Sequence, residues 1–92
     1  MGEGGKIKIY PRDLELGEFI EVPMVPGKRQ EPVIKGKGPS VWAVASYAIK
    51  WGMTPEEISA MWKGEITPEE VQAAIDFWKK YPEYIEDKNP PD

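Results

Sequence analysis

A four-residue motif that starts helices occurs twice in the second half of this 92-residue chain. Thr54-Pro55-Glu56-Glu57 recurs as Thr67-Pro68-Glu69-Glu70. In each copy the threonine can cap a helix by accepting a hydrogen bond from an orphaned backbone N–H, and the proline falls at the first helical position, where a missing N–H costs nothing. The last glutamate of each copy can reach back and complete a capping box. The repeat therefore predicts two consecutive helices whose glutamates serve capping, not catalysis.

Apolar residues at helical spacing extend this prediction to three helices. Ser40 can cap the first helix and Gly52 can end it. Gly64 is expected to end the second helix, and Pro82 to stop the third. The predicted helices span residues 41–51, 55–63 and 68–80. Because a tight turn joins the second and third helices, the pattern indicates a mainly α fold with a helix-turn-helix-like, three-helix core.

The N-terminal third alternates polar and apolar residues over two short runs. Residues 6–10 and 18–22 are strand candidates that can form a hairpin, within one subunit or between two. Pro32-Val33-Ile34 is a further brief extended piece within a Pro- and Gly-rich loop. We therefore expect an N-terminal arm over residues 1–31, a three-helix domain over residues 32–81 and a loose polar tail over residues 82–92. Tyr84 and Ile85 can tie the start of that tail to the core.

The composition excludes most catalytic chemistry. The chain has no cysteine and no histidine, so it lacks a thiolate nucleophile, the commonest general base and the commonest metal ligands. We expect no enzymatic activity, no cofactor, no metal and no small-molecule substrate. The sequence shows no signal peptide and no apolar run long enough to span a membrane, which predicts a cytoplasmic protein. Its many Pro, Lys and Glu residues suit a thermophile.

Charge divides the chain into two unequal parts. Residues 1–39 carry seven Lys/Arg and six Asp/Glu, whereas residues 40–92 carry five and ten, for a net charge of −4. The acidic second part argues against broad electrostatic binding to nucleic acid. The loop over residues 26–40 is the most basic segment, and it is either a solvated loop or a phosphate-contacting patch.

Four tryptophans punctuate the helical region. They are Trp42, Trp51, Trp62 and Trp78. Core packing is the first interpretation, and an aromatic platform for single-stranded bases is the alternative. The helix over residues 41–51 is apolar on so many sides that it is expected to lie between other elements or in a dimer interface.

Several short motifs, in order and at similar spacing, resemble the domain-of-unknown-function family 433. Pro32-Val33-Ile34-Lys35-Gly36 resembles the first part of the family pattern P-V-I-x-G-T-R. The later family patterns G-[MLY]-S-x-E-E-I and L-T-x-E-x-[VI] followed by A-A-L resemble residues 52–58 and 66–75. The resemblance covers roughly residues 32–80. The chain departs from the family pattern at Gly36-Lys37-Gly38, where the family has Gly-Thr-Arg. It also departs in the turn between the second and third helices, residues 61–65, which is about one residue longer than usual.

The resemblance implies a small homeodomain-like protein that acts as an antitoxin in a prokaryotic toxin–antitoxin pair. Such a protein is expected to form a homodimer, to hold a PIN-like ribonuclease toxin and to bind double-stranded operator DNA. The alternative function is a homodimeric protein-interaction or scaffold module without DNA binding. The residues that can contact DNA are Lys28, Arg29, Lys35, Lys37, Gln72, Lys79 and Lys80. The residues that can contact a protein partner are Glu83, Tyr84, Glu86 and Asp87.

Negative charge at the start of the third predicted helix weakens the prediction of DNA binding. Glu69 and Glu70 lie at the start of the would-be recognition helix, where they would face phosphate repulsion. An acidic segment instead suits a ribonuclease, whose substrate is anionic. The sequence therefore favours protein binding over DNA reading.

Overall fold

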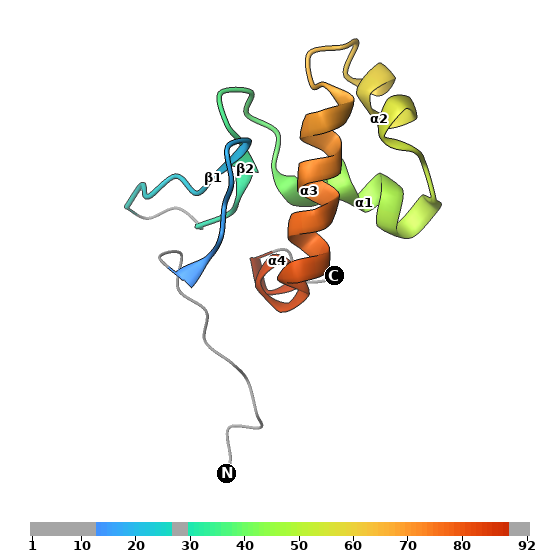
Figure 1. The fold of residues 1–92 in the computed structure, drawn as a ribbon. Coiled ribbons are helices and arrows are strands. Elements are labelled where there is room, and N and C mark those ends of the chain that lie inside the picture. Colours follow the sequence, from blue (N-terminus) through green and yellow to red (C-terminus); the bar gives the residue numbers. More distant parts are fainter. Residues whose placement is uncertain (1–12, 27–29, 89–92) are drawn as a thin grey trace.

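The protein is mainly helical, as predicted, with a short antiparallel hairpin on the N-terminal side of the helices (Figure 1). The computed structural model describes residues 13–26 and 30–88. Its elements, in chain order, are β1 (Ile20–Glu21), β2 (Val33–Ile34), α1 (Val41–Trp51), α2 (Pro55–Met61), α3 (Pro68–Lys80) and α4 (Pro82–Lys88). No helix in these ranges is long and apolar enough to cross a membrane.

Both predicted capping boxes are present. The Thr54 side chain accepts from the Glu57 backbone N–H and the Glu57 carboxylate accepts from the Thr54 N–H, which starts α2. Thr67 and Glu70 make the same two bonds at the start of α3. The repeat therefore does what its residues predict: each copy satisfies two backbone donors that a helix start leaves unpaired.

The predicted ends of α1 and α3 are also confirmed, whereas α2 is shorter than predicted. Ser40 caps α1, and Gly52 ends it in the left-handed conformation (φ 72°) that glycine adopts without strain. α2 ends at Met61 because the chain leaves helical geometry at Trp62 and takes positive φ at Lys63 and Gly64. The Gly64 N–H then bonds the Ser59 carbonyl at 3.1 Å, which closes the turn towards α3.

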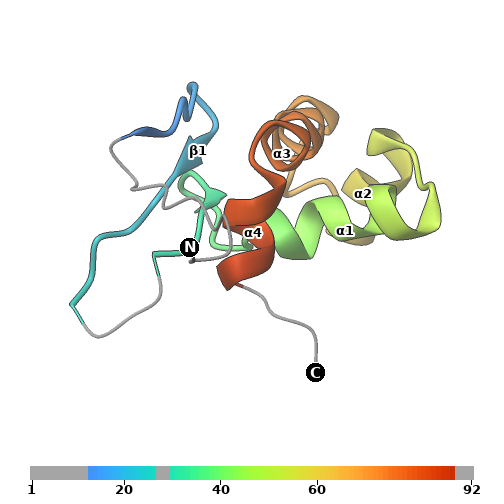
Figure 2. The same ribbon diagram turned by 90° about the horizontal axis from the view of Figure 1, so that it is seen from below.

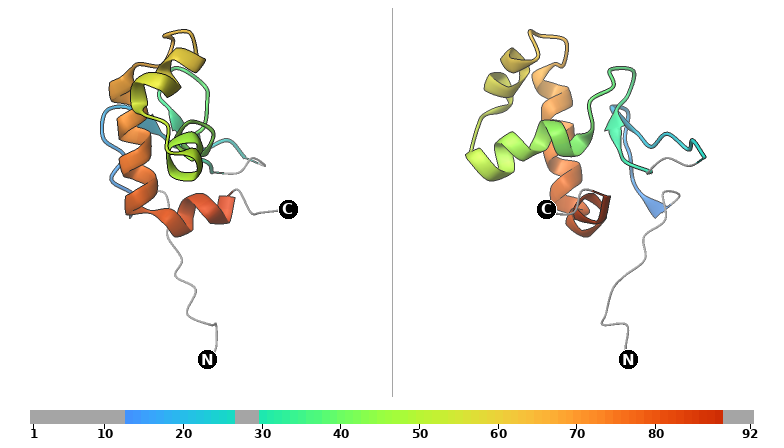
Figure 3. Two further views of the ribbon diagram at one scale, coloured as in Figure 1. Left: turned by 90° about the vertical axis from the view of Figure 1, so that its right-hand side faces the viewer. Right: turned by 180° about the vertical axis from the view of Figure 1, so that it is seen from behind.

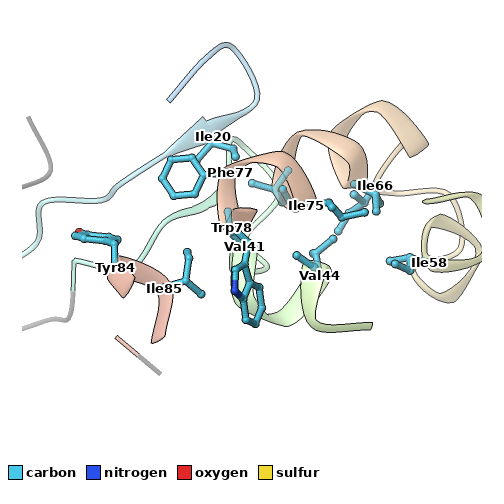
Figure 4. Close-up of a cluster of buried hydrophobic side chains, with 14 of the residues drawn as sticks. Ile20, Val41, Val44, Ile58, Ile66, Ile75, Phe77, Trp78, Tyr84 and Ile85 are labelled. Atoms are coloured by element: carbon cyan, nitrogen blue, oxygen red, sulfur yellow. The ribbon is translucent and has the colours of Figure 1, made fainter. Parts of the chain in front are cut away.

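The core forms where α1 crosses α3, and α2 covers one end of both helices (Figure 1). Val41 and Val44 of α1 and Ile75 and Trp78 of α3 meet in this core, with Ile58 of α2 beside them (Figure 4). Full burial of each such aliphatic side chain contributes about 1.5–3 kcal/mol. The turn between α2 and α3 is fixed to the core by the buried Ser59 hydroxyl, which donates to the Ile66 carbonyl at 2.6 Å. This arrangement is the predicted helix-turn-helix-like core.

The hairpin joins β1, which comes from the strand candidate at residues 18–22, to β2. Ile20 lies opposite Ile34, and Glu21 opposite Val33. Residues 6–10, the other strand candidate, lie outside the described residues. The brief extended piece at residues 33–34 is confirmed, and it supplies the pairing within the same chain. Ile20 and Ile34 are both buried, so the hairpin packs its apolar face on the helices.

The prediction of a loose tail is wrong for residues 82–88, which form α4. This helix leaves the end of α3 at a steep angle and runs beneath the core (Figures 2 and 3). Tyr84 and Ile85 are buried, and the Tyr84 hydroxyl donates to the Gln30 carbonyl at 2.5 Å. The expected attachment of these two residues to the core is thus confirmed. Their burial is the physical reason why the segment is ordered as a helix.

Candidate binding surfaces

The outward side of α3, the would-be recognition helix, carries as many acids as lysines, and the acids lie nearer its start. The residues exposed along it are Glu69, Gln72, Asp76, Lys79 and Lys80. Gln72, the one residue near the helix start that suits base reading, donates from Nε2 to Asp76 Oδ1 at 3.0 Å. The amide that would read a base edge is therefore engaged with a carboxylate, and two acids flank it on the same helix.

Lys37 ties the loop before α1 to the start of α3. Its Nζ donates to the Glu65 carbonyl at 2.6 Å and to Glu70 Oε1 at 3.3 Å. Lys37 is partly exposed, and its ammonium group is directed towards Glu70. As a result, the lysine predicted to contact phosphate has an internal partner in this structure.

Glu70 is buried, with only 8% of its surface exposed, and its carboxylate is paired with Lys37. Burial by itself raises the pKa of Glu70, but the hydrogen bonds from the Thr67 backbone and from Lys37, with the positive charge of Lys37, outweigh burial. The pKa of Glu70 is consequently held below its ordinary value of 4.5. The carboxylate remains ionised at neutral pH and serves the fold.

Lys80 is a second predicted DNA contact that has an internal partner. It forms an ion pair with Glu15, which connects the end of α3 to the N-terminal segment. The hydrogen bond and the positive charge of Lys80 lower the pKa of Glu15, and the hydrogen bond to Glu15 raises the pKa of Lys80. Both side chains are exposed, so solvent screens this pair and its contribution to stability is small.

The other predicted contacts are divided between surface and core. Lys35, in the turn after β2, and Lys79 are exposed, whereas Lys28 and Arg29 lie outside the described residues. Among the predicted protein contacts, Glu83 and Glu86 are exposed on α4. Tyr84 is a correction: it is buried, because the packing of α4 places its ring in the core. Asp87 belongs to α4, but its side chain lies outside the described part of the structure.

A second surface, which the sequence reasoning did not assign as a site, lies on the side of α1 opposite its buried face. It is a concavity of about 330 Å³ that we call the aromatic groove. It is lined by Trp42, Ala43, Ser46, Tyr47, Lys50 and Trp51 of α1 and by Trp62 at the end of α2. Tyr47 and Trp62 meet edge to face, with ring centroids 6.0 Å apart. The groove thus offers an aromatic wall on two helices.

The tryptophans are distributed differently from the first expectation. Core packing is correct for Trp78, which is 5% exposed, and wrong for Trp51, which is 75% exposed. Trp42 and Trp62 are half-buried. A sequence signal for this surface existed: Trp42, Ser46 and Lys50 are spaced by four residues, and so are Ala43, Tyr47 and Trp51. These two rows lie on one side of a helix, opposite the row of buried valines.

The aromatic groove carries one charged side chain and no carboxylate among its lining residues. Lys50 Nζ lies 5.4 Å from the centroid of the Trp42 ring, within cation–π distance. The groove therefore differs in charge from the outward side of α3. Among the described residues, moreover, no cluster of acidic side chains has the geometry to hold a metal ion.

Comparison with known proteins identifies the family without assigning a function. A family model described as a protein of unknown function (DUF433) matches residues 28–78, more than half of the chain. Searches of the curated proteins and of the solved structures gave no match. The matched segment runs from the basic loop to the end of the core part of α3, and includes the hairpin's second strand and both capping boxes. The chain therefore belongs to the DUF433 family.

Proposed function

We propose that this chain is a non-enzymatic binding protein, the antitoxin of a prokaryotic toxin–antitoxin pair, and that it binds a PIN-like ribonuclease. One observation carries the proposal: among the described side chains of α3 and α4, carboxylates outnumber the two exposed lysines, Lys79 and Lys80. The exposed acids are Glu69, Asp76, Glu83 and Glu86. A ribonuclease must attract an anionic substrate, so its binding surface complements such a partner electrostatically. The role would place the protein in the cytoplasm, where the toxin is made.

Titration calorimetry against the protein encoded by the adjacent reading frame tests this proposal. We expect a binding isotherm at low ionic strength and co-elution in gel filtration. The variant Glu83→Gln/Glu86→Gln should bind about tenfold more weakly at low salt, with a smaller loss at high salt because salt screens exposed charges. Both carboxylates are exposed and outside the hydrophobic core, so the variant should remain folded.

Glu56→Gln/Glu65→Gln is the matched control. It removes two exposed carboxylates from α2 and the following turn, one of them in the first turn of a helix as Glu83 is. Its affinity should equal that of the wild type within about twofold, since the charges lie on a different element. Absence of both heat and co-elution with the wild-type chain would eliminate the toxin-binding proposal.

Operator DNA is a second candidate ligand, favoured by the helix-turn-helix-like arrangement of α2 and α3. Because Lys37 and Lys80 have internal partners, its described contacts reduce to Lys35 and Lys79. Binding to the upstream promoter fragment should then be weak and fall steeply with salt, and Lys35→Ala/Lys79→Ala should lower the salt slope by about 2. A promoter affinity that does not respond to salt would argue against it. The alternative function remains a homodimeric scaffold module that binds no DNA.

A further inference from the structure

The aromatic groove is an apolar concavity that the described part of the chain leaves uncovered, and the proposed toxin and DNA contacts do not use it. It sits on the side of α1 that faces away from α3, and two of its lining residues, Ala43 and Ser46, are small. Trp51 lines the groove from the last position of α1, with three-quarters of its surface in solvent. An exposed tryptophan of this kind is unusual without a partner, because burying an aromatic ring is among the most favourable contributions to association.

From this geometry we infer that the aromatic groove is the interface between two copies of this chain, in which Trp51 of each copy enters the groove of the other. A two-fold interface requires one surface to carry both halves of each contact. The groove meets that requirement, because α1 supplies both the exposed Trp51 ring and most of the residues that line the concavity. The volume also fits: a cavity of about 150 Å³ holds benzene, and the groove, with about 330 Å³, has room for an indole.

The distribution of charge favours a second copy in this orientation. The chain carries a net charge of −4, so two copies repel each other if their acidic sides meet. The groove has no lining carboxylate and lies on the opposite side of α1 from α3. Association through the groove therefore keeps the carboxylates of α3 in solvent. Lys50, already over its own Trp42 ring, can also contact the incoming indole through a cation–π interaction.

The size of the surface predicts a dimer of moderate strength. Trp51 is exposed, the other aromatic residues of the groove are partly exposed, and Ile49, next to the groove on α1, is also exposed. With 150–250 Å² for each aromatic side chain, the uncovered apolar area is on the order of 400 Å². This is about half of the roughly 800 Å² that each partner contributes to a standard interface. We therefore expect a dissociation constant of roughly 10 µM, within the range of weak interfaces.

Sedimentation velocity of the full chain between about 1 and 300 µM tests the inference. The wild type should shift from monomer to dimer over this range, with a matching change in tryptophan fluorescence. Trp51→Ala should raise the dissociation constant at least tenfold, so that at about 30 µM most of the variant is monomeric whereas most of the wild type is dimeric. Ser46→Arg, which fills the hollow and leaves Trp51 in place, should have the same effect. Both side chains lie on the outer side of α1, so the thermal unfolding midpoint should change by less than about 3 °C.

Met24→Ala is the matched control, since Met24 is an exposed apolar residue (62%) outside the groove and should leave the dimer unchanged. A wild type that stays monomeric at 300 µM overturns the inference, as does a dimer that persists unchanged in Trp51→Ala. If the wild type is monomeric and Trp51→Ala instead loses binding to the neighbouring gene product, the groove belongs to a different protein, and the inference is wrong. The Glu83→Gln/Glu86→Gln variant should dimerise normally, so failure of the toxin proposal and failure of this one give different results.

Discussion

The two capping boxes have the same four residues and the same hydrogen bonds, yet they occupy different environments. The backbone N–H of each threonine donates to its glutamate at 2.9 Å in both boxes. Glu57 is exposed, however, whereas Glu70 is buried and also receives Lys37 from a loop 33 residues earlier in the chain. The comparison separates two roles of one motif. In α2 the box only starts a helix, and in α3 it also joins the loop before α1 to the three-helix core.

Removal of the glutamate from each box should break this comparison most clearly. Glu70→Ala loses a buried, charge-assisted hydrogen bond as well as the cap, and should lower the free energy of unfolding by about 2 kcal/mol. Glu57→Ala loses only an exposed cap and should cost about 0.5 kcal/mol. Urea unfolding followed by circular dichroism gives both values, provided that the m-value is unchanged. Equal losses would show that the burial of Glu70 adds nothing.

Removal of the threonine caps should show a smaller difference. Thr67→Ala should cost about 1.5 kcal/mol and Thr54→Ala about 0.7 kcal/mol, near the two ends of the range for N-cap substitutions. The reason is that α3 supplies much of the core, whereas α2 is short and lies at one end. The same urea experiment measures both. A larger loss at Thr54 than at Thr67 would contradict this ranking.

Lys37→Met should cost about 1 kcal/mol, because it leaves the Glu65 carbonyl and one acceptor site of Glu70 without a protein donor. A double-mutant cycle sharpens the comparison. With Glu70→Ala the two losses should be non-additive by about 0.5–1 kcal/mol, and with Glu57→Ala they should simply add. Additivity in both cycles would mean that the Lys37–Glu70 contact makes no net contribution.

The smallest effect concerns pH. The pKa of Glu70 is lowered in the folded protein, so its ionised form stabilises the fold fully above its unfolded value of 4.5. That stabilisation is lost as the pH falls below 4.5 through the lower folded pKa. The difference in unfolding free energy between the wild type and Glu70→Gln should therefore shrink from pH 6 to pH 3. A constant difference over this range would argue against the lowered pKa.

Local sequence predicted the helical part of this fold well, because capping and periodicity act within a few residues. The starts of α1, α2 and α3 followed from Ser40, Thr54 and Thr67, and the matched family was recognised from the same segments. Prediction of the candidate sites was poorer. Lys37 reads as a free cation in the sequence, because its partners Glu65 and Glu70 are distant in the chain.

Burial decided what periodicity left open. All four tryptophans have helical spacing and equal hydrophobicity, so the sequence cannot rank them, yet Trp78 is buried and Trp51 is exposed. The crossing of α1 and α3 covers only one side of α1, which leaves the aromatic groove on the other. α4 was missed for a related reason. Its seven residues are too short to form a stable helix alone, and only the burial of Tyr84 and Ile85 makes it one.

By itself, then, the sequence determined where the first three helices start, which residue types the chain lacks and to which family it belongs. These properties depend on neighbouring residues or on residue types, so no tertiary information is needed. The tertiary structure alone decided the pairing of Ile20 with Ile34, the internal partners of Lys37 and Lys80, and the exposure of Trp51. Each of these depends on contacts between segments far apart in the chain, and such contacts exist only after the helices have packed.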